Sequence, residues 1–409
     1  MEEYKTYTLE ELSIGKGSYG IAASAVPFDT SLHTYLRITD INDDGTLNKS
    51  GLMSVDEDEA GKYLLKPNDI VFARTGNSTG RSYFYDGSDG ELVYAGFLIK
   101  FSLDNKKVNP RILKYYTHSR PYYDWVKSFD TGGTRGNINA KTYGSMPIVL
   151  PHRTAQDKIV DVLKSFDDKI EVNRRLNENL EQQAQALFKS WFVDFEPFKN
   201  GEFVESELGM IPKGWRVDSL SAIADYINGL AMQKFRPLDG EAGLPVIKIK
   251  ELGLGNTDIN SELCSPSLIS EKYIINDGDI IFSWSGTLMV KIWCGGRCGL
   301  NQHLFIVVPN NYPKWFAYQW TRFHLDNFIR IAKDKAVTMG HIKRGELDKA
   351  KVAIPDEESL HKIDLLMTPL QQKIISNELE SRRLAQLRDT LLPRLMSGEL
   401  KVNEIENVL

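Results

Sequence analysis

A glycine-rich stretch near the N-terminus has the most suggestive spacing in the chain. GKGSYG (15–20) fits G-x-G-x-x-G, the turn with which dinucleotide-binding folds hold phosphate groups. That turn needs an apolar strand before it and a helix after it. Here the preceding segment is polar, and Pro27 follows too soon for a proper helix. We therefore interpret the stretch as an ordinary glycine-rich loop.

The sulfur and imidazole side chains do not form a recognisable metal or catalytic set. Cys264, Cys294, Cys298 and His303 could form a zinc site, but C-x3-C is not the usual C-x2-C spacing and the first half of the chain has no counterpart. The histidines form no H-x-x-x-H pair, and no Walker loop or amino-methyltransferase motif is present. We expect buried or incidental thiols, no metal, no catalytic residue and no cofactor in this chain.

Two classes of polar loop are better candidates for a binding site. One follows each "DI-x-F" segment, at 69–72 and 279–282, and the other precedes each long helical tract. Arg and Asn can read base edges with paired hydrogen bonds, whereas Ser and Thr contact phosphates. For any single residue a plain polar turn is the more common role, so the prediction depends on paired loops whose side chains differ. The candidate DNA-binding residues are Arg74, Asn77, Ser78, Thr79, Arg81, Thr134, Arg135, Asn137, Trp284, Ser285, Thr287, Lys291, Thr338, His341 and Lys343.

A repeated framework must position these loops. YLLKPNDIVFARTG (63–76) corresponds to YIINDGDIIFSWSG (273–286), and SMPIVLP (145–151) corresponds to KAKVAIP (349–355). Corresponding blocks keep their order along the chain at a nearly constant offset. The sequence therefore predicts two copies of one plan, each a strand-rich globule followed by a long helix.

The helical tracts show the clearest periodicity. Gln156 to Trp191 contains no Pro or Gly and carries apolar residues in two heptad rows, which predicts a long helix that packs against one partner helix. The second tract repeats the pattern: Ile363 lies 204 positions after Ile159. Asn173, Asn177 and Asn377 interrupt the two seams near their middle. Buried there, they would fix the register of the helix pair, whereas at the rim they would lie in water.

Composition and charge narrow the class of protein. At 409 residues with 42% hydrophobic content, the chain is expected to form two or more folded domains. We expect a cytoplasmic protein, because the acidic N-terminus lacks an apolar leader and three cysteines suit a reducing compartment. The net charge of −5 is unlike that of most nucleic-acid binders. Any DNA contact must therefore come from local loops, or partners must neutralise the phosphates.

These features together predict an α+β chain. We expect two tandem, mixed but β-rich globules, each followed by a long helix that packs against one partner helix. The predicted divisions are 1–151 for the first globule, 152–195 for the central helix, 196–355 for a linker and the second globule, 356–398 for the second helix and 399–409 for a tail.

The motifs of the chain resemble those of one known family. The stretches that carry the resemblance are SYGIAASAVPFD (18–29), YLRITDI (35–41), ALFKSWFVDFEPF (186–198), GMIPKGW (209–215), NQHLFIV (301–307) and LLPRLMSGEL (391–400). They resemble those of the specificity subunits of type I restriction–modification systems, and the resemblance covers nearly the whole chain.

The resemblance implies a non-catalytic subunit whose two globules are target-recognition domains, each reading one half of a bipartite, asymmetric site in double-stranded DNA. The two helices would pair as an antiparallel coiled coil, set the spacing and dock two methyltransferase subunits. Two ATP-driven motor-nuclease subunits would complete the complex. S-adenosylmethionine, ATP and Mg²⁺ would belong to those partners, and no membrane is implied. The candidate docking residues are Trp191, Phe192, Phe195 and Phe198, and the second helix has no counterpart to them.

Two alternatives remain. A stand-alone DNA methyltransferase or nuclease with a related recognition domain would need catalytic motifs that we do not find. A scaffold whose globules bind protein would leave the difference between the paired loops unexplained.

Overall fold

The computed structural model describes residues 4–129, 136–258, 260–334, 340–401 and 404. The chain forms two compact units that are not contiguous in sequence. Unit 1 comprises Met1–Asp168 and Leu384–Leu409, and unit 2 comprises Lys169–Arg383. Each unit therefore contains one globule and part of each long helix.

Unit 1 contains two four-stranded sheets and a separate strand pair. The first sheet has the order β2-β9-β6-β7, and the second has the order β3-β5-β4-β8. The strands are β1 (Lys5–Thr8), β2 (Ser18–Tyr19), β3 (Val26–Pro27), β4 (His33–Leu36), β5 (Met53–Val55), β6 (Asp69–Ala73), β7 (Ser82–Tyr85), β8 (Leu92–Tyr94), β9 (Leu98–Ser102) and β10 (Pro147–Leu150). All pairings are antiparallel except β4 with β8, and β1 pairs with β10.

Short helices cover the first sheet of unit 1. They are α1 (Pro110–Tyr116), α2 (Arg120–Lys127) and α3 (Ala140–Gly144), with the 3₁₀ turns η1 (Ile38–Asp40), η2 (Ala60–Tyr63) and η3 (Gly76–Ser78). The strand β6 is buried at all five positions, as its unbroken DIVFA run predicts. Phe72 on this strand stacks on Tyr143 of α3 with ring centroids 4.7 Å apart, which fixes the loop before α3 against the sheet.

Unit 2 repeats this plan and adds the strand pair β11 and β12. Its sheets have the orders β14-β21-β18-β19 and β16-β15-β20-β17, while β13 pairs with β22 and β11 with β12. The strands are β11 (Phe203–Ser206), β12 (Gly209–Pro212), β13 (Arg216–Ser219), β14 (Ala224–Asn228), β15 (Leu244–Ile247), β16 (Leu263–Cys264), β17 (Ile274–Ile275), β18 (Ile280–Ser283), β19 (Met289–Ile292), β20 (Cys298–Leu300), β21 (Leu304–Pro309) and β22 (Lys351–Ile354). The helices are α5 (Leu220–Ile223), α6 (Ile249–Leu254), α7 (Lys314–Phe323), α8 (Leu325–Asp334) and α9 (Gly345–Lys349), with η4 (Glu196–Phe198), η5 (Met232–Lys234) and η6 (Glu271–Tyr273).

The predicted internal repeat is confirmed by topology. The sheet β2-β9-β6-β7 corresponds to β14-β21-β18-β19, and the parallel pair β4–β8 corresponds to β15–β20. The loops after β6 and β18 both need a left-handed residue, which is Gly76 (φ 70°) in unit 1 and Gly286 (φ 65°) in unit 2. The matching glycines explain why "ARTG" and "SWSG" occupy corresponding positions.

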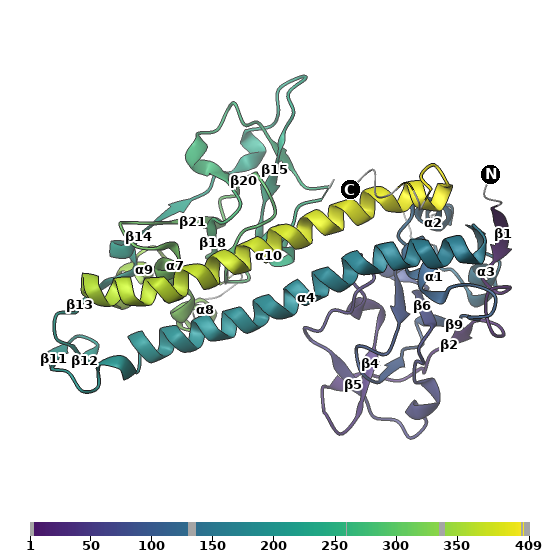
Figure 1. Ribbon diagram of the computed structural model, residues 1–409, viewed down its shortest axis with the longest axis horizontal. Coiled ribbons are helices and arrows are strands. Elements are labelled where there is room, and N and C mark those ends of the chain that lie inside the picture. Colours follow the sequence, from purple (N-terminus) through teal and green to yellow (C-terminus); the bar gives the residue numbers. More distant parts are fainter. Residues whose placement is uncertain (1–3, 130–135, 259, 335–339, 402–403, 405–409) are drawn as a thin grey trace. The chain divides into compact units, whose positions relative to one another are not determined.

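The two long helices are α4 (Arg153–Phe192) and α10 (Glu357–Ser397), and they run side by side in opposite directions (Figure 1). In unit 1 Arg388 donates to Asp167 over 2.8 Å, and in unit 2 Asn377 donates to Asn177 over 2.8 Å. The residue numbers of the partners on α10 decrease as those on α4 increase, so the helices are antiparallel, as the family resemblance implies. Both helices lie within the predicted divisions 152–195 and 356–398, and Asp356 caps α10 by accepting from the Ser359 amide.

Candidate nucleic-acid interface

The two predicted loop classes meet in unit 1. The amide of Ile138, in the loop before α3, donates to the Arg74 carbonyl over 3.0 Å. The Arg74 amide donates in turn to the carbonyl of Phe97, which precedes β9. Three segments far apart in sequence are thus tied together at one end of the sheet, with Asn77 and Asn137 exposed beside them.

The corresponding loops meet in the same way in unit 2. The Ile342 amide donates to the Trp284 carbonyl over 3.1 Å, and the Gly286 amide donates to the Gly340 carbonyl over 2.9 Å. Ser285 and His341 form an isolated antiparallel bridge between these bonds. Pairing of the two loop classes is therefore a property of the fold in both units.

Arg74 carries a guanidinium that no carboxylate neutralises among the described residues. It lies over the Tyr19 ring, 5.1 Å from the centroid, and its Nε is buried without a hydrogen-bond partner. An unsatisfied donor of this kind is costly unless a ligand or water completes it. Arg74 is accordingly the best placed donor in unit 1 for a bound base or phosphate.

Other predicted residues are occupied within their own unit. Arg81 donates to the Ile41 carbonyl over 3.0 Å and lies 2.7 Å from an Asp43 carboxylate oxygen. Lys291 donates to the Gly253 carbonyl over 2.7 Å, and burial lowers its pKa. These contacts engage both cations within their own unit, which favours a structural role over a contact with DNA.

Some of the remaining candidates are likewise bonded or buried within unit 1, whereas another is exposed. Thr79 donates its hydroxyl to the Gly76 carbonyl, and Ser78 is buried. Thr287 is exposed. Thr134, Arg135 and Thr338 lie outside the described residues.

Trp284 forms the wall of an open hollow of about 490 Å³ in unit 2. Its ring lies 5.7 Å from Phe305 and meets His341 edge-on at 6.3 Å between centroids. Its indole N–H donates to Asn228 Oδ1 over 3.0 Å, and the exposed Lys343 is at the rim. The hollow combines an aromatic wall with amide, imidazole and cationic groups, which suits a planar polar ligand.

Sequence reasoning missed four residues beside these loops: Tyr19, Phe97, Asn228 and His303. Tyr19 and Phe97 are 41% and 56% exposed although aromatic. His303 Nδ1 lies 3.1 Å from Ser285 Oγ, within hydrogen-bond distance. Tyr19 and His303 do occur in the blocks SYGIAASAVPFD and NQHLFIV, which was the available signal, but only the strand pairing places them at the loops.

The predicted docking aromatics pack mainly inside unit 2. Phe192 is 2% exposed, and its ring lies 5.5 Å from that of Trp215. Phe195 and Phe198 meet Trp215 at 5.5 and 5.0 Å. A docking role does not fit the buried Phe192, which stabilises the core. Trp191, Phe195 and Phe198 are partly exposed, and their docking role stays a prediction.

The three seam asparagines are buried in unit 2 rather than placed at the rim. Asn377 donates to Asn177 Oδ1, and Asn177 donates to a Glu378 carboxylate oxygen over 2.8 Å. Asn173 donates to Glu380, which lowers the pKa of that carboxyl, and to the Asn377 carbonyl over 3.3 Å. The side-chain oxygens of Asn173 and Asn377 are buried without a partner. This polar layer is specific to one alignment of the helices, because a shifted helix would lose all of these bonds.

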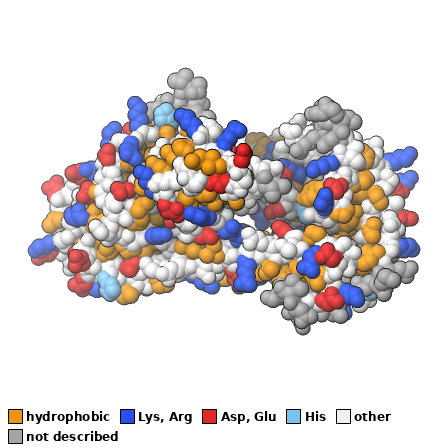
Figure 2. All heavy atoms as spheres, turned by 90° about the horizontal axis from the view of Figure 1, so that it is seen from above, with side chains coloured by type: hydrophobic (Ala, Val, Ile, Leu, Met, Phe, Trp, Pro, Cys, Tyr) orange, Lys and Arg blue, Asp and Glu red, His pale blue; other side chains and the backbone are white. Residues whose placement is uncertain are grey.

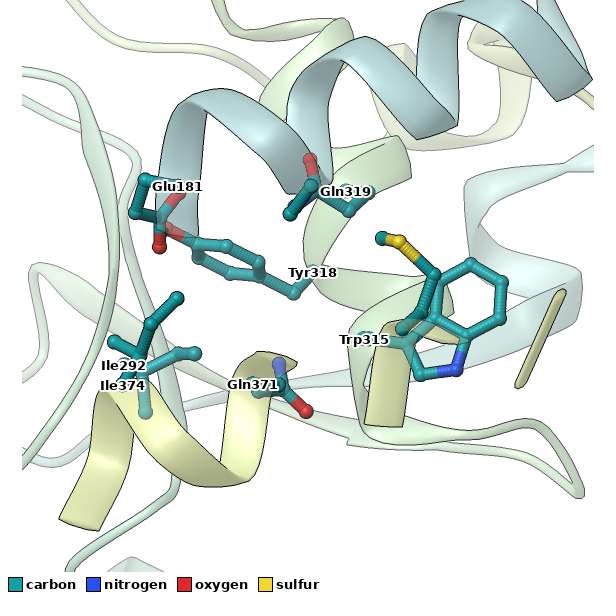
Figure 3. Close-up of a pocket in the computed structure, with 9 residues that line it drawn as sticks. Glu181, Ile292, Trp315, Tyr318, Gln319, Gln371 and Ile374 are labelled. Carbon is teal, nitrogen blue, oxygen red and sulfur yellow. Dashed lines mark hydrogen bonds between the residues drawn. The ribbon is translucent and has the colours of Figure 1, made fainter. Parts of the chain in front are cut away.

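A second, much smaller space lies where the two long helices pack against the globule of unit 2. It holds about 10 Å³, enough for one water, between α4, α7 and α10. In Figure 3, Glu181 of α4 points toward Tyr318 of α7, and Ile374 and Gln371 approach from α10. Glu181 also pairs with Arg322. The space is too small for a ligand, so it belongs to the packing of the unit.

Three further observations bear on the class of protein. Cys264 and Cys298 are buried, and burial raises the pKa of the Cys298 thiol to about 12. Within the described ranges no group of His, Cys, Asp and Glu side chains could hold a metal ion, and no helix there is long and apolar enough to cross a membrane. Acidic and basic side chains are interspersed over the face in Figure 2, so this face has no continuous basic surface.

Comparison with known proteins agrees with the fold and the motifs. The family model described as "Type I restriction modification DNA specificity domain" matches residues 1–182 and 212–387. The chain is 33% identical over 305 residues to the MjaIX specificity subunit of Methanocaldococcus jannaschii, covering 72% of this chain and 69% of that protein. It is 24% identical to the HindI specificity subunit of Haemophilus influenzae, covering 96% of this chain and 99% of that protein.

A solved structure has the same fold. The type I restriction-modification S subunit from M. genitalium aligns over 96% of both chains with a TM-score of 0.51 at 15% identity. The repeated β-rich units, the paired helices and the family match together identify the function class. The chain belongs to the type I restriction–modification DNA specificity family, and it is the DNA specificity subunit, non-catalytic in this family, of a type I restriction–modification complex.

Proposed function

We propose that unit 1 and unit 2 each read one half of a bipartite, asymmetric sequence in double-stranded DNA. The observation that carries the proposal is that the two loop classes pair in both units while their side chains differ. One backbone bond is equivalent in the two units: the Ile138 amide donates to the Arg74 carbonyl, and the Ile342 amide donates to the Trp284 carbonyl. Arg74 in unit 1 corresponds to Trp284 in unit 2. A shared backbone frame with different side chains is what two readers of different base sequences require.

The paired helices α4 and α10 are proposed to set the spacer between the half-sites and to dock two methyltransferase subunits. At about 1.5 Å per residue, the 40 residues of α4 span about 60 Å. The buried asparagine layer supports the ruler role because it favours a single alignment. Docking is proposed for Trp191, Phe195 and Phe198, whose rings are partly exposed at the end of α4.

We propose that the catalytic activities of the complex belong to its partner subunits. Two methyltransferase subunits would bind S-adenosylmethionine, and two motor-nuclease subunits would use ATP and Mg²⁺. Because the chain has a net charge of −5, tight DNA binding also needs the partners to neutralise phosphates. A subunit that reads chromosomal DNA would work in the cytoplasm of a bacterium or archaeon.

Exchange of one globule tests the two-reader proposal. Residues 1–150 are replaced by the first globule of another family member, and the complex with its methyltransferase subunits is assayed by sequencing of methylated DNA. One half-site should change while the other is retained. A change in both half-sites, or in neither, would contradict independent readers.

The alternative of a stand-alone enzyme needs a separate test. The purified chain is incubated with S-adenosylmethionine and DNA, with and without the methyltransferase subunits. We expect methyl transfer only when the partners are present. Turnover by the chain alone would refute the non-catalytic assignment.

A further inference from the structure

The two units place four corresponding positions around their tied loops. Arg74 and Trp284 follow β6 and β18, and Phe97 and His303 immediately precede β9 and β21. Asn137 and His341 precede Ile138 and Ile342, whose amides make the equivalent loop bonds. Correspondence at these three positions follows from strand ends and hydrogen bonds, independently of side-chain likeness.

The fourth position, Tyr19 in unit 1 and Asn228 in unit 2, is fixed by a close backbone approach. The next residue is Gly20 in unit 1, where a Cβ would lie 2.2 Å from the Tyr94 carbonyl oxygen. In unit 2 the next residue is Gly229, where a Cβ would lie 2.3 Å from the Leu300 and Asn301 carbonyl oxygens. Both sites exclude any side chain, so the strand end that presents Tyr19 or Asn228 is held in the same place.

In unit 1 these positions hold a cationic donor that lies over one aromatic ring. The Arg74 guanidinium lies over Tyr19, and the carbonyl of Phe97 holds the Arg74 backbone. The Tyr19 hydroxyl is fixed by the Ala140 amide at 3.1 Å. An arginine with no carboxylate partner among the described residues can present two parallel N–H groups, the pattern that guanine O6 and N7 accept.

In unit 2 the same positions hold a different chemistry. Asn228 Oδ1 accepts the Trp284 indole N–H, which orients the amide. Its NH₂ group has no hydrogen-bond partner among the described residues and can donate to a ligand. The faces of Trp284 and Phe305 form an apolar wall in the same hollow. A donor beside an apolar wall suits thymine, which offers O4 as an acceptor and a C5 methyl group.

We propose that the side chains at these four positions contact the bases in each unit and form its base-reading set. This inference rests on the proposed function, in which each unit reads DNA. The sets are Tyr19, Arg74, Phe97 and Asn137 in unit 1, and Asn228, Trp284, His303 and His341 in unit 2. Unit 1 reads a guanine through Arg74. Unit 2 reads a thymine through Asn228 and Trp284.

The test uses the complex with its methyltransferase subunits and a library of randomised duplexes, with the methylated sequences read out. Arg74→Lys keeps the positive charge but loses the two-pronged donor. We expect the preference for guanine at one base pair of one half-site to fall by about 5- to 150-fold, with the other half-site unchanged. Asn228→Leu should weaken thymine preference at one base pair of the other half-site by a similar factor.

Each unit offers a matched control, one on the loop after β6 and one on strand β19. Arg81→Lys and Lys291→Gln change cations whose side chains are bound within their own unit. The sequence logo should be unchanged in both. Phe97→Leu changes an exposed member of the first set and His303→Asn a half-buried member of the second, so neither removes a core side chain.

Each outcome separates this inference from the proposed function. If the wild-type complex methylates a bipartite target but Arg74→Lys and Asn228→Leu leave every base preference unchanged, the reading sets are wrong and the two-reader proposal stands. If the wild-type complex shows no sequence preference, the proposed function fails first. A variant that loses methylation on all sequences at a normal melting temperature supplies affinity rather than specificity, which overturns its assignment. If a variant melts early, the result for Phe97→Leu or His303→Asn decides for that unit.

Discussion

The buried asparagine layer gives the sharpest prediction about the helix pair. Asn377 donates to Asn177 over 2.8 Å, and both side chains are buried. The double variant Asn177→Leu with Asn377→Leu replaces both partners by apolar groups of similar size. Removing both members of a hydrogen-bonded pair is nearly neutral or stabilising, whereas removing one leaves the other unsatisfied.

The expected magnitudes follow from that asymmetry. Each single variant leaves the partner asparagine buried without its hydrogen bond, which lowers the free energy of unfolding by about 1–3 kcal/mol. For a unit of this size, a change of 1 kcal/mol moves the melting temperature by about 2–4 °C. We expect each single variant to melt about 2–12 °C below wild type and the double variant to melt at or above it. Asn179→Leu, on the exposed face of α4, is the matched control and should change stability by less than about 0.5 kcal/mol.

The functional assay measures spacing. The complex is offered targets whose half-sites are moved apart one base pair at a time, and methylation of each target is measured. Wild type and Asn179→Leu should prefer one spacing, while the double variant should accept neighbouring spacings because its seam no longer distinguishes one alignment. An unchanged preference in the double variant would refute the register role. A double variant less stable than both singles would refute the energetic reasoning.

Two further predictions concern stability. Phe192→Ala should destabilise unit 2 by about 3–5 kcal/mol because it removes a buried ring beside Trp215, while Val193→Ala on the exposed side should have little effect; calorimetry of both variants checks this. Burial alone would raise the pKa of Asp167, but the ion pairs with Lys114 and Arg388 outweigh it and hold that pKa below its usual value. A depressed carboxyl pKa contributes stability above the unfolded pKa of about 3.9 that is lost as pH falls through the lower folded value. Asp167→Asn should therefore cost about 1–3 kcal/mol at pH 7 and flatten the loss of stability below about pH 4, which melting curves across pH will show.

Patterns that depend on periodicity were predictable from the sequence. The heptads of α4 and α10 and the paired "DI-x-F" strands specify their partners through repeated apolar positions, and the structure confirms both. The burial of Asn173, Asn177 and Asn377 was left open because a seam asparagine has the same sequence signature at the rim and in the core. Only packing against the facing helix distinguishes the two.

The candidate site was harder to predict, because the tertiary structure decides whether a side chain is free to bind a ligand or is engaged within the protein. Arg74 and Arg81 look alike in sequence, yet Arg81 is bound to Asp43 and Arg74 lies over Tyr19 with no carboxylate partner among the described residues. Tyr19 was missed because it belongs to a two-residue strand, β2, which is too short to show any periodicity. Asn228 was missed because its position opposite Trp284 depends on strand pairing.

The acidic composition of the chain bears on how it can be selective. Contacts to phosphate attract all sequences equally, and a chain with a net charge of −5 gains little from them. Discrimination must then come from short-range donors and apolar contacts such as those of Arg74, Asn228 and Trp284. Each set lies entirely within one unit. If each unit reads its own half-site, as proposed, the single variants should preserve the untouched half-site even where overall affinity falls.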